Sequence, residues 1–232
     1  MSEEIDAIMF DVGGTLVDLS PPKEEIFRRV LARNGFQVPL MSVAKAVAEA
    51  EKAFDGQGAV VDGVDEGPFW KRYDQFVLDR LGAVVDLEAF SRELSKEFES
   101  MLDRAESWAE YPDARPLLED LKGRDFKLGI ISNATDLVDR VLDHLDLAKY
   151  FDPVVVSYAV GVRKPDRRIF QIAAERVRAA PNRMIYIGDK LAVDVVGASR
   201  AGLNAVLLDR MSVYEDASCL RIRSLSALRH YL

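Results

Sequence analysis

The chain has 232 residues, of which 49% are hydrophobic and 30% are charged, and its net charge at pH 7 is -8. This length is enough for one large domain, or for a domain with a smaller companion, and for a buried core. The negative charge disfavours nucleic-acid binding. No apolar run reaches the roughly 18 residues that span a bilayer. The single cysteine, Cys219, excludes a disulfide within the chain.

The first residues, MSEEID, are acidic and lack the anatomy of a signal peptide. We therefore expect a cytoplasmic protein without nucleic-acid or membrane partners. The sequence does not define an oligomeric state.

Five short apolar runs predict strands, and helical patterns separate most of them. Near-continuous runs rich in Ile and Val are typical of a parallel sheet that is covered on both faces. Alternating strands and helices favour a doubly wound, Rossmann-like α/β fold. The predicted strands are Ile5–Phe10, Phe126–Ser132, Pro153–Ser157, Met184–Gly188 and Ala205–Leu208, and the predicted helices are Ala114–Gly123, Asp136–Leu145, Arg167–Val177 and Val193–Ala201.

The stretch from Leu19 to Trp108 differs, because it contains helical patterns and no convincing strand. A glycine-rich segment at 56–67 predicts a loop within it. We expect an α-helical domain of residues 18–108, inserted into an α/β core of residues 1–17 and 109–232. The predicted helices of the insertion are Lys23–Asn34, Ser42–Phe54, Phe69–Leu81 and Leu87–Leu102.

Polar residues stand at or near the ends of the predicted strands, where open α/β sheets bind their ligands. Each of them alone has an ordinary explanation, such as a helix cap, a turn or a solvated lysine. Their joint occurrence, in this order, indicates a single site. The residues are Asp11 in DVGGT, Ser132 and Asn133, Lys164 in RKPD, and Asp189 and Asp194 in GDKLAVD.

With these motifs the sequence resembles the haloacid dehalogenase superfamily of hydrolases, whose last motif reads here as GDKLAVDVVGASRAG. The resemblance implies that Asp11 attacks the phosphorus of a small phosphorylated metabolite and forms an aspartyl phosphate. It implies a Mg²⁺ cofactor held by Asp11, the backbone carbonyl of Gly13, Asp189 and Asp194, the last through water or by orienting the others. The helical insertion resembles the family's cap domain, placed directly after the first motif.

The resemblance also implies a phosphate-binding set. Ser132, the N–H of Asn133 and Lys164 would hold the transferring oxygens and offset their negative charge. Gly13 and Gly14 would let the phosphate approach the backbone, and Thr15 would steady this loop. Two alternatives stay open: Asp194 caps the helix that follows it, or Lys190 competes with Lys164 for the cationic role.

Gly13 departs from the family pattern, because most phosphatases of the family have an Asp there. That Asp protonates the leaving alcohol and activates water, and losing such a group costs about 10²–10⁴ in rate. We favour a Mg²⁺-dependent phosphatase that is slow, uses a good leaving group or borrows an acid/base group from the cap.

Two other interpretations remain. One is a different hydrolase of the family. A metal-free dehalogenase is disfavoured by Asp189, whereas a phosphonate-cleaving enzyme would need a cap lysine, for which Lys23, Lys45 and Lys52 are candidates. The other is a catalytically weakened binding or regulatory protein, which the retained motif residues disfavour.

Overall fold

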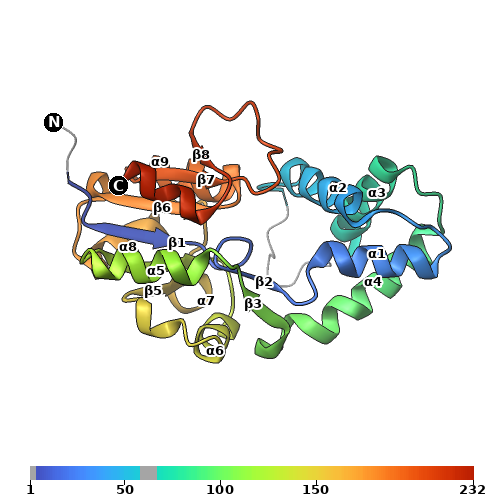
Figure 1. Cartoon of the computed structure of the whole chain (residues 1–232), viewed down its shortest axis with the longest axis horizontal. Coiled ribbons are helices and arrows are strands. Elements are labelled where there is room, and N and C mark those ends of the chain that lie inside the picture. Colours follow the sequence, from blue (N-terminus) through green and yellow to red (C-terminus); the bar gives the residue numbers. More distant parts are fainter. Residues whose placement is uncertain (1–3, 58–66) are drawn as a thin grey trace. The chain divides into compact units, whose positions relative to one another are not determined.

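The structure, a computed structural model, describes residues 4–57 and 67–232 (Figure 1). The chain divides into two compact units, Met1–Asp18 with Trp108–Leu232, and Leu19–Ser107. We call them the core unit and the helical unit. Most of the loop predicted at 56–67 lies outside the described residues.

The core unit is built on a parallel sheet in which strands distant in sequence are neighbours. Its six strands follow the order β5-β4-β1-β6-β7-β8. The predicted doubly wound, Rossmann-like α/β fold is confirmed. The strands are β1 (Ala7–Phe10), β4 (Lys127–Ser132), β5 (Val154–Val156), β6 (Met184–Gly188), β7 (Asn204–Leu208) and β8 (Leu220–Ile222). Strand β8 was not predicted, because Leu220 is 38% exposed and only Ile222 of this strand is buried, which leaves no apolar run to detect.

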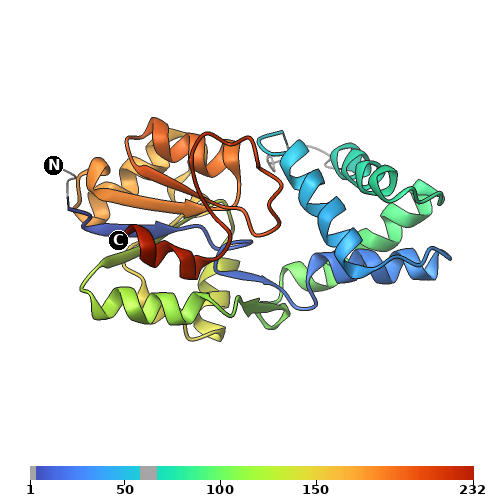
Figure 2. The same ribbon diagram turned by 45° about the horizontal axis from the view of Figure 1, so that its top comes forward.

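Helices lie on both sides of this sheet (Figure 2). On one face, Phe170 and Ala198 pack with Met9 and Tyr186 of the strands in a single hydrophobic core. The helices of the core unit are α5 (Ala114–Gly123), α6 (Leu137–His144), α7 (Ser157–Val160), α8 (Arg167–Val177) and α9 (Val196–Arg200), with short turns at η2 (Ala148–Tyr150), η3 (Pro181–Arg183), η4 (Leu191–Val195) and η5 (Leu225–Tyr231).

The prediction of one continuous helix at Val193–Ala201 is wrong at its start. Its first part belongs to a π-helical turn, η4, and only then does α9 begin. The N–H of Val195 donates to the carbonyl of Lys190, five residues earlier, at 3.2 Å. Such wide turns are frequent at functional sites, and they are invisible to helical periodicity.

Two short strands connect the core unit to the insertion. Strands β2 (Val17–Leu19) and β3 (Trp108–Glu110) pair in a two-stranded sheet. The expectation of no strand between Leu19 and Trp108 is therefore wrong at both ends of that range. Strands of three residues are too short for an alternating pattern to be recognised.

The helical unit contains α1 (Lys23–Arg33), α2 (Leu40–Ala53), α3 (Gly67–Leu81) and α4 (Leu87–Leu102), with a short turn at η1 (Ala105–Ser107). Helix α2 starts two residues before the predicted Ser42, directly after Pro39, which supplies an extended N-cap. The first two residues of the helix, Leu40 and Met41, are exposed. Among the residues described here, no helix is both long and apolar enough to cross a membrane.

Candidate active site

The fold brings three strand ends together around Asp11. Strand β1 lies between β4 and β6, and Phe10 is in register with Ile130 on one side and Ile187 on the other. The N–H of Asp11 donates to the carbonyl of Ile187 at 2.9 Å, which fixes the backbone where β1 ends. Because parallel strands end at the same edge of a sheet, the residues after β1, β4 and β6 converge there.

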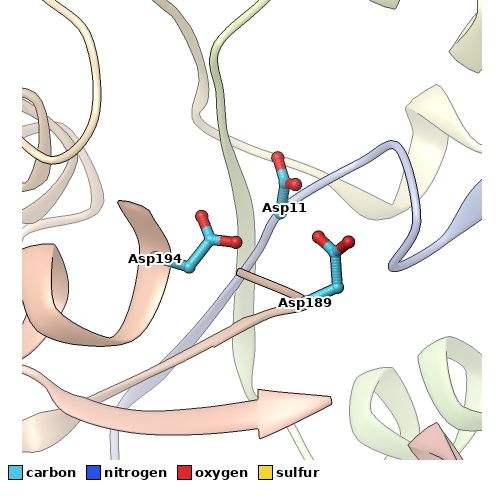
Figure 3. A group of neighbouring side chains, drawn as sticks. All are labelled: Asp11, Asp189 and Asp194. Atoms are coloured by element: carbon cyan, nitrogen blue, oxygen red, sulfur yellow. The ribbon is translucent and has the colours of Figure 1, made fainter. Parts of the chain in front are cut away.

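Three carboxylates meet at this edge. One oxygen from each of Asp11, Asp189 and Asp194 lies within 4.8 Å of the others, and Figure 3 shows the three side chains turned toward a common space. Carboxylate oxygens are the hard donors that Mg²⁺ prefers. The donor set therefore fits a magnesium ion.

Lys164 is the buried cation of the site, with a side chain that is 2% exposed. Its Nζ lies 2.8 Å from Asp11 Oδ1 and 2.7 Å from Asp194 Oδ1, and it donates to the hydroxyl of Tyr186 at 2.8 Å. The side chain of Asn133 fastens the lysine's backbone: Oδ1 accepts from the Lys164 N–H at 2.7 Å and Nδ2 donates to the Lys164 carbonyl at 2.9 Å. The loop before α8 is thus tied to the end of β4.

Burial and mutual charge act on the protonation of this cluster. Burial raises the pKa of the Asp11 carboxyl above its usual range, against the opposing effect of the Lys164 charge. Burial by itself would lower the pKa of Lys164, but the carboxylates of Asp11 and Asp194 outweigh it and raise that pKa. The carboxylates thus favour the charged form of the lysine, which offsets negative charge at Asp11.

Asp194 is the most completely enclosed of the three carboxylates. Its Oδ1 accepts from Lys164 and from the hydroxyl of Tyr186 at 2.9 Å, and its Oδ2 accepts from the N–H of Lys190 at 2.9 Å. A Cβ atom on Gly188 would lie 2.4 Å from the Asp194 Cγ, so this close packing requires a glycine. Asp194 Oδ2 accepts from the N–H of Lys190, which precedes it in the chain, and the first turn of α9 has no side-chain cap. The alternative that Asp194 caps the following helix is therefore wrong.

Lys190 does not take the place of Lys164. Its Nζ lies 3.1 Å from Asp189 Oδ2, and its side chain is 29% exposed. Only Lys164 contacts Asp11 among the ion pairs of the described residues.

The loop after Asp11 is a tight turn. The carbonyl of Val12 accepts from the N–H groups of Leu16 at 2.8 Å and Val17 at 3.0 Å. Gly14 has a φ of +76°, and a Cβ there would lie 2.6 Å from Asp189 Oδ2, so any other residue would strain the turn and displace that carboxylate. Thr15 is fully buried, and its hydroxyl has no hydrogen-bond partner among the described residues.

Gly13 is different from Gly14. A Cβ at Gly13 would meet Trp108 at 3.8 Å, which is ordinary van der Waals contact. The position that lacks the family's second Asp therefore has room for a Cβ atom.

The predicted site residues lie together, with Asp11, Asn133, Lys164, Asp189 and Asp194 joined by the contacts above. Ser132 ends β4 and is 5% exposed. The sequence analysis missed Tyr186, which lies in the apolar run MIYIG. The signal was available, because a tyrosine in a fully buried strand needs a hydrogen-bond partner for its hydroxyl.

Comparison with known proteins agrees with this arrangement. The family model for haloacid dehalogenase-like hydrolases matches residues 5–202, so the chain belongs to this family of hydrolases. It is 30% identical to a glyceraldehyde 3-phosphate phosphatase of Methanopyrus kandleri, over 91% of this chain and 87% of the relative.

Two further similarities cover different extents. A phosphoserine phosphatase of Thermus thermophilus is 32% identical over 65% of this chain and 58% of the relative. The crystal structure of a dehalogenase has the same fold, with a TM-score of 0.65 at 23% identity over 100% of this chain and 99% of that chain. The shared fold therefore does not by itself distinguish phosphatase from dehalogenase chemistry.

Proposed function

We propose that this hydrolase is a Mg²⁺-dependent phosphatase that acts on a small phosphorylated metabolite in the cytoplasm. The observation that carries the proposal is the convergence of carboxylate oxygens from Asp11, Asp189 and Asp194 within 4.8 Å, beside the buried ammonium of Lys164. With Asp11 as nucleophile and Asp194 beside Lys164, a site for hydrolysis at carbon would have no need of the further carboxylate of Asp189. The relatives that are named phosphatases support the same chemistry.

In this proposal Asp11 is the nucleophile. Its carboxylate forms a bond to phosphorus while the bond between phosphorus and the leaving oxygen breaks, and water later cleaves the aspartyl phosphate. Lys164, already 2.8 Å from Asp11 Oδ1, offsets the charge of the transferring oxygens together with Ser132 and the Asn133 N–H.

Asp11, the Gly13 carbonyl and Asp189 would hold the Mg²⁺ ion, which would supply positive charge opposite the phosphoryl oxygens. Asp194 plays a different part in this assignment. Since donors from the chain already occupy both of its oxygens, it orients Lys164 and acts on the ion indirectly.

We assign the role of a cap to the helical unit, Leu19–Ser107, which would exclude water and select the substrate. The lysines of the helical unit do not support phosphonate cleavage. A Schiff-base lysine needs a desolvated amine. Lys23 is ion-paired with Glu51, and Lys45 and Lys52 are exposed.

The test is phosphate release from p-nitrophenyl phosphate, glyceraldehyde 3-phosphate and phosphoserine, with 2-haloacids and phosphonates as competing classes. We expect phosphate release that requires Mg²⁺ and stops with a chelator. Asp189→Ala should weaken Mg²⁺ binding in calorimetry, whereas the exposed control Asp216→Ala should not. Full activity in chelator, or halide release without phosphate release, would refute the proposal.

A further inference from the structure

The hydroxyl of Tyr186 closes a triangle with Lys164 and Asp194. The three sides are 2.7 Å from Lys164 Nζ to Asp194 Oδ1, 2.8 Å from Lys164 Nζ to the hydroxyl, and 2.9 Å from the hydroxyl to Asp194 Oδ1. The carbonyl of Ile131 lies 3.2 Å from the same hydroxyl. Tyr186 is fully buried, so water does not compete for any of these contacts.

Each hydrogen-bond donor of the triangle has one acceptor. An ammonium has three N–H donors, and Lys164 has acceptors in Asp11, Asp194 and Tyr186. The tyrosine accepts one N–H and gives its own proton to Asp194 Oδ1, whose two lone pairs are then used by Lys164 and Tyr186. No donor of the lysine remains unassigned.

We propose that Tyr186 is a positioning residue for Lys164: by taking one N–H, with Asp194 taking another, it directs the third at Asp11. Its kinetic consequence rests on the phosphatase function proposed above. The Asp11 contact is also the one that can exchange. The Asp11 side chain is 12% exposed, whereas that of Asp194 is 1% exposed and Tyr186 is fully buried.

A phosphoryl oxygen entering the site therefore replaces Asp11 as the acceptor of that third N–H, while the other two stay fixed. The lysine side chain can therefore donate to the transferring group without changing its own position. A preorganised donor of this kind acts on the catalysed step more than on substrate binding.

The position of the tyrosine ring is set independently of its hydroxyl. The ring packs edge-on against Phe170 of α8, with centroids 5.2 Å apart, within the core that joins α8 to the sheet. Tyr186→Phe keeps this packing and removes only the oxygen. The matched control is Tyr150→Phe, a buried tyrosine whose hydroxyl makes a long contact of 3.4 Å to Glu119.

The experiment measures kcat and KM for p-nitrophenyl phosphate with saturating Mg²⁺, and the melting temperature. For Tyr186→Phe we expect kcat to fall about 10-fold with KM within about twofold of the parent, because the lost contact orients a group used in the chemical step. Tyr150→Phe should leave both constants unchanged. A kcat within twofold of the parent, or a change confined to KM, would overturn the proposal.

A second measurement does not depend on turnover. The ¹H–¹⁵N signal of the Lys164 ammonium should be sharp in the parent and in Tyr150→Phe, and broadened or lost in Tyr186→Phe. If the parent releases no phosphate from any ester, the proposed function fails, and this signal still decides the positioning role. An equally sharp signal in Tyr186→Phe would refute it.

Discussion

The two units bury charge in opposite ways. In the core unit the Lys164 ammonium lies against two carboxylates and a hydroxyl, so that its donors and their acceptors are matched. In the helical unit the carboxyl of Asp74 on α3 is 4% exposed and accepts one hydrogen bond, from Ser91 on α4, at 2.6 Å. Ionised groups are retained inside a protein when they are paired, and an unpaired acid becomes neutral instead.

Their pKa shifts follow from this difference. Burial raises the pKa of Asp74 to about 6, with the hydrogen bond from Ser91 opposing it. The pKa of Lys164 is raised, because the adjacent carboxylates outweigh the burial that would lower it. A buried group with charged partners stays ionised and can act in chemistry. Burial of an acid without a cation lowers the stability of the fold by an amount that depends on pH.

The largest expected effect removes the charge of Asp11 within the matched cluster. Asp11→Asn should lower kcat by about 10⁴-fold or more, since the nucleophile is lost. Stability should change little, because Lys164 remains paired with Asp194 at 2.7 Å. The measurement is phosphate release with a parallel melting curve. Asp139→Asn on the surface of α6 is the control, and activity within tenfold of the parent would exclude Asp11 as nucleophile.

The second effect removes the cation instead. Lys164→Met leaves Asp11 and Asp194 buried without their partner, so the free energy of unfolding should fall by about 3–5 kcal/mol. The measurement is urea unfolding in chelator, which keeps a metal ion from replacing the lysine. Adding Asp194→Asn should recover part of the loss. If Lys164→Met alone is as stable as the parent, the charges of the cluster do not stabilise the fold.

The third effect concerns Asp74. Its folded pKa, about 6, exceeds the unfolded value of about 3.9, so the folded state binds more protons in this window and stability falls as pH rises through it. Across this pH range the free energy of unfolding should fall by about 3 kcal/mol in total. Asp74→Asn should remove this pH dependence and be more stable than the parent above about pH 7.

Urea unfolding at pH values on either side of this window measures the effect. Asp79→Asn is the control, since Asp79 is exposed on the same helix. A parent whose stability rises between about pH 4 and pH 6, while that of Asp74→Asn is unchanged, would contradict the assignment.

The smallest effect adds a carboxylate to the core unit. The Cβ of Gly13→Asp would lie 3.8 Å from Trp108 without a clash, and the variant should raise phosphate-ester hydrolysis by up to about 10²-fold, since it restores an acid/base group. The gain should be largest for alkyl phosphates, whose leaving groups need protonation most. A variant that folds and binds Mg²⁺ but gains nothing would show that the helical unit supplies this group, or that the chemistry is different.

The sequence alone determined the parallel sheet and most helices, because buried strands and amphipathic helices have characteristic periods. Ala114–Gly123, Arg167–Val177 and Met184–Gly188 agree with the structure to the residue. It also pointed to Asp11, Asp189 and Lys164, since residues at the ends of parallel strands share one edge.

Only the tertiary structure decided how these residues are connected. The Tyr186 hydroxyl, the Asn133 side chain on the Lys164 backbone and the Asp194 carboxylate packed on Gly188 are contacts between residues that local periodicity does not relate. The same holds for Asp74, whose burial depends on how α3 meets α4. Hydrogen-bond partners and the loss of solvent depend on the packed chain, and no pattern along the sequence encodes them directly.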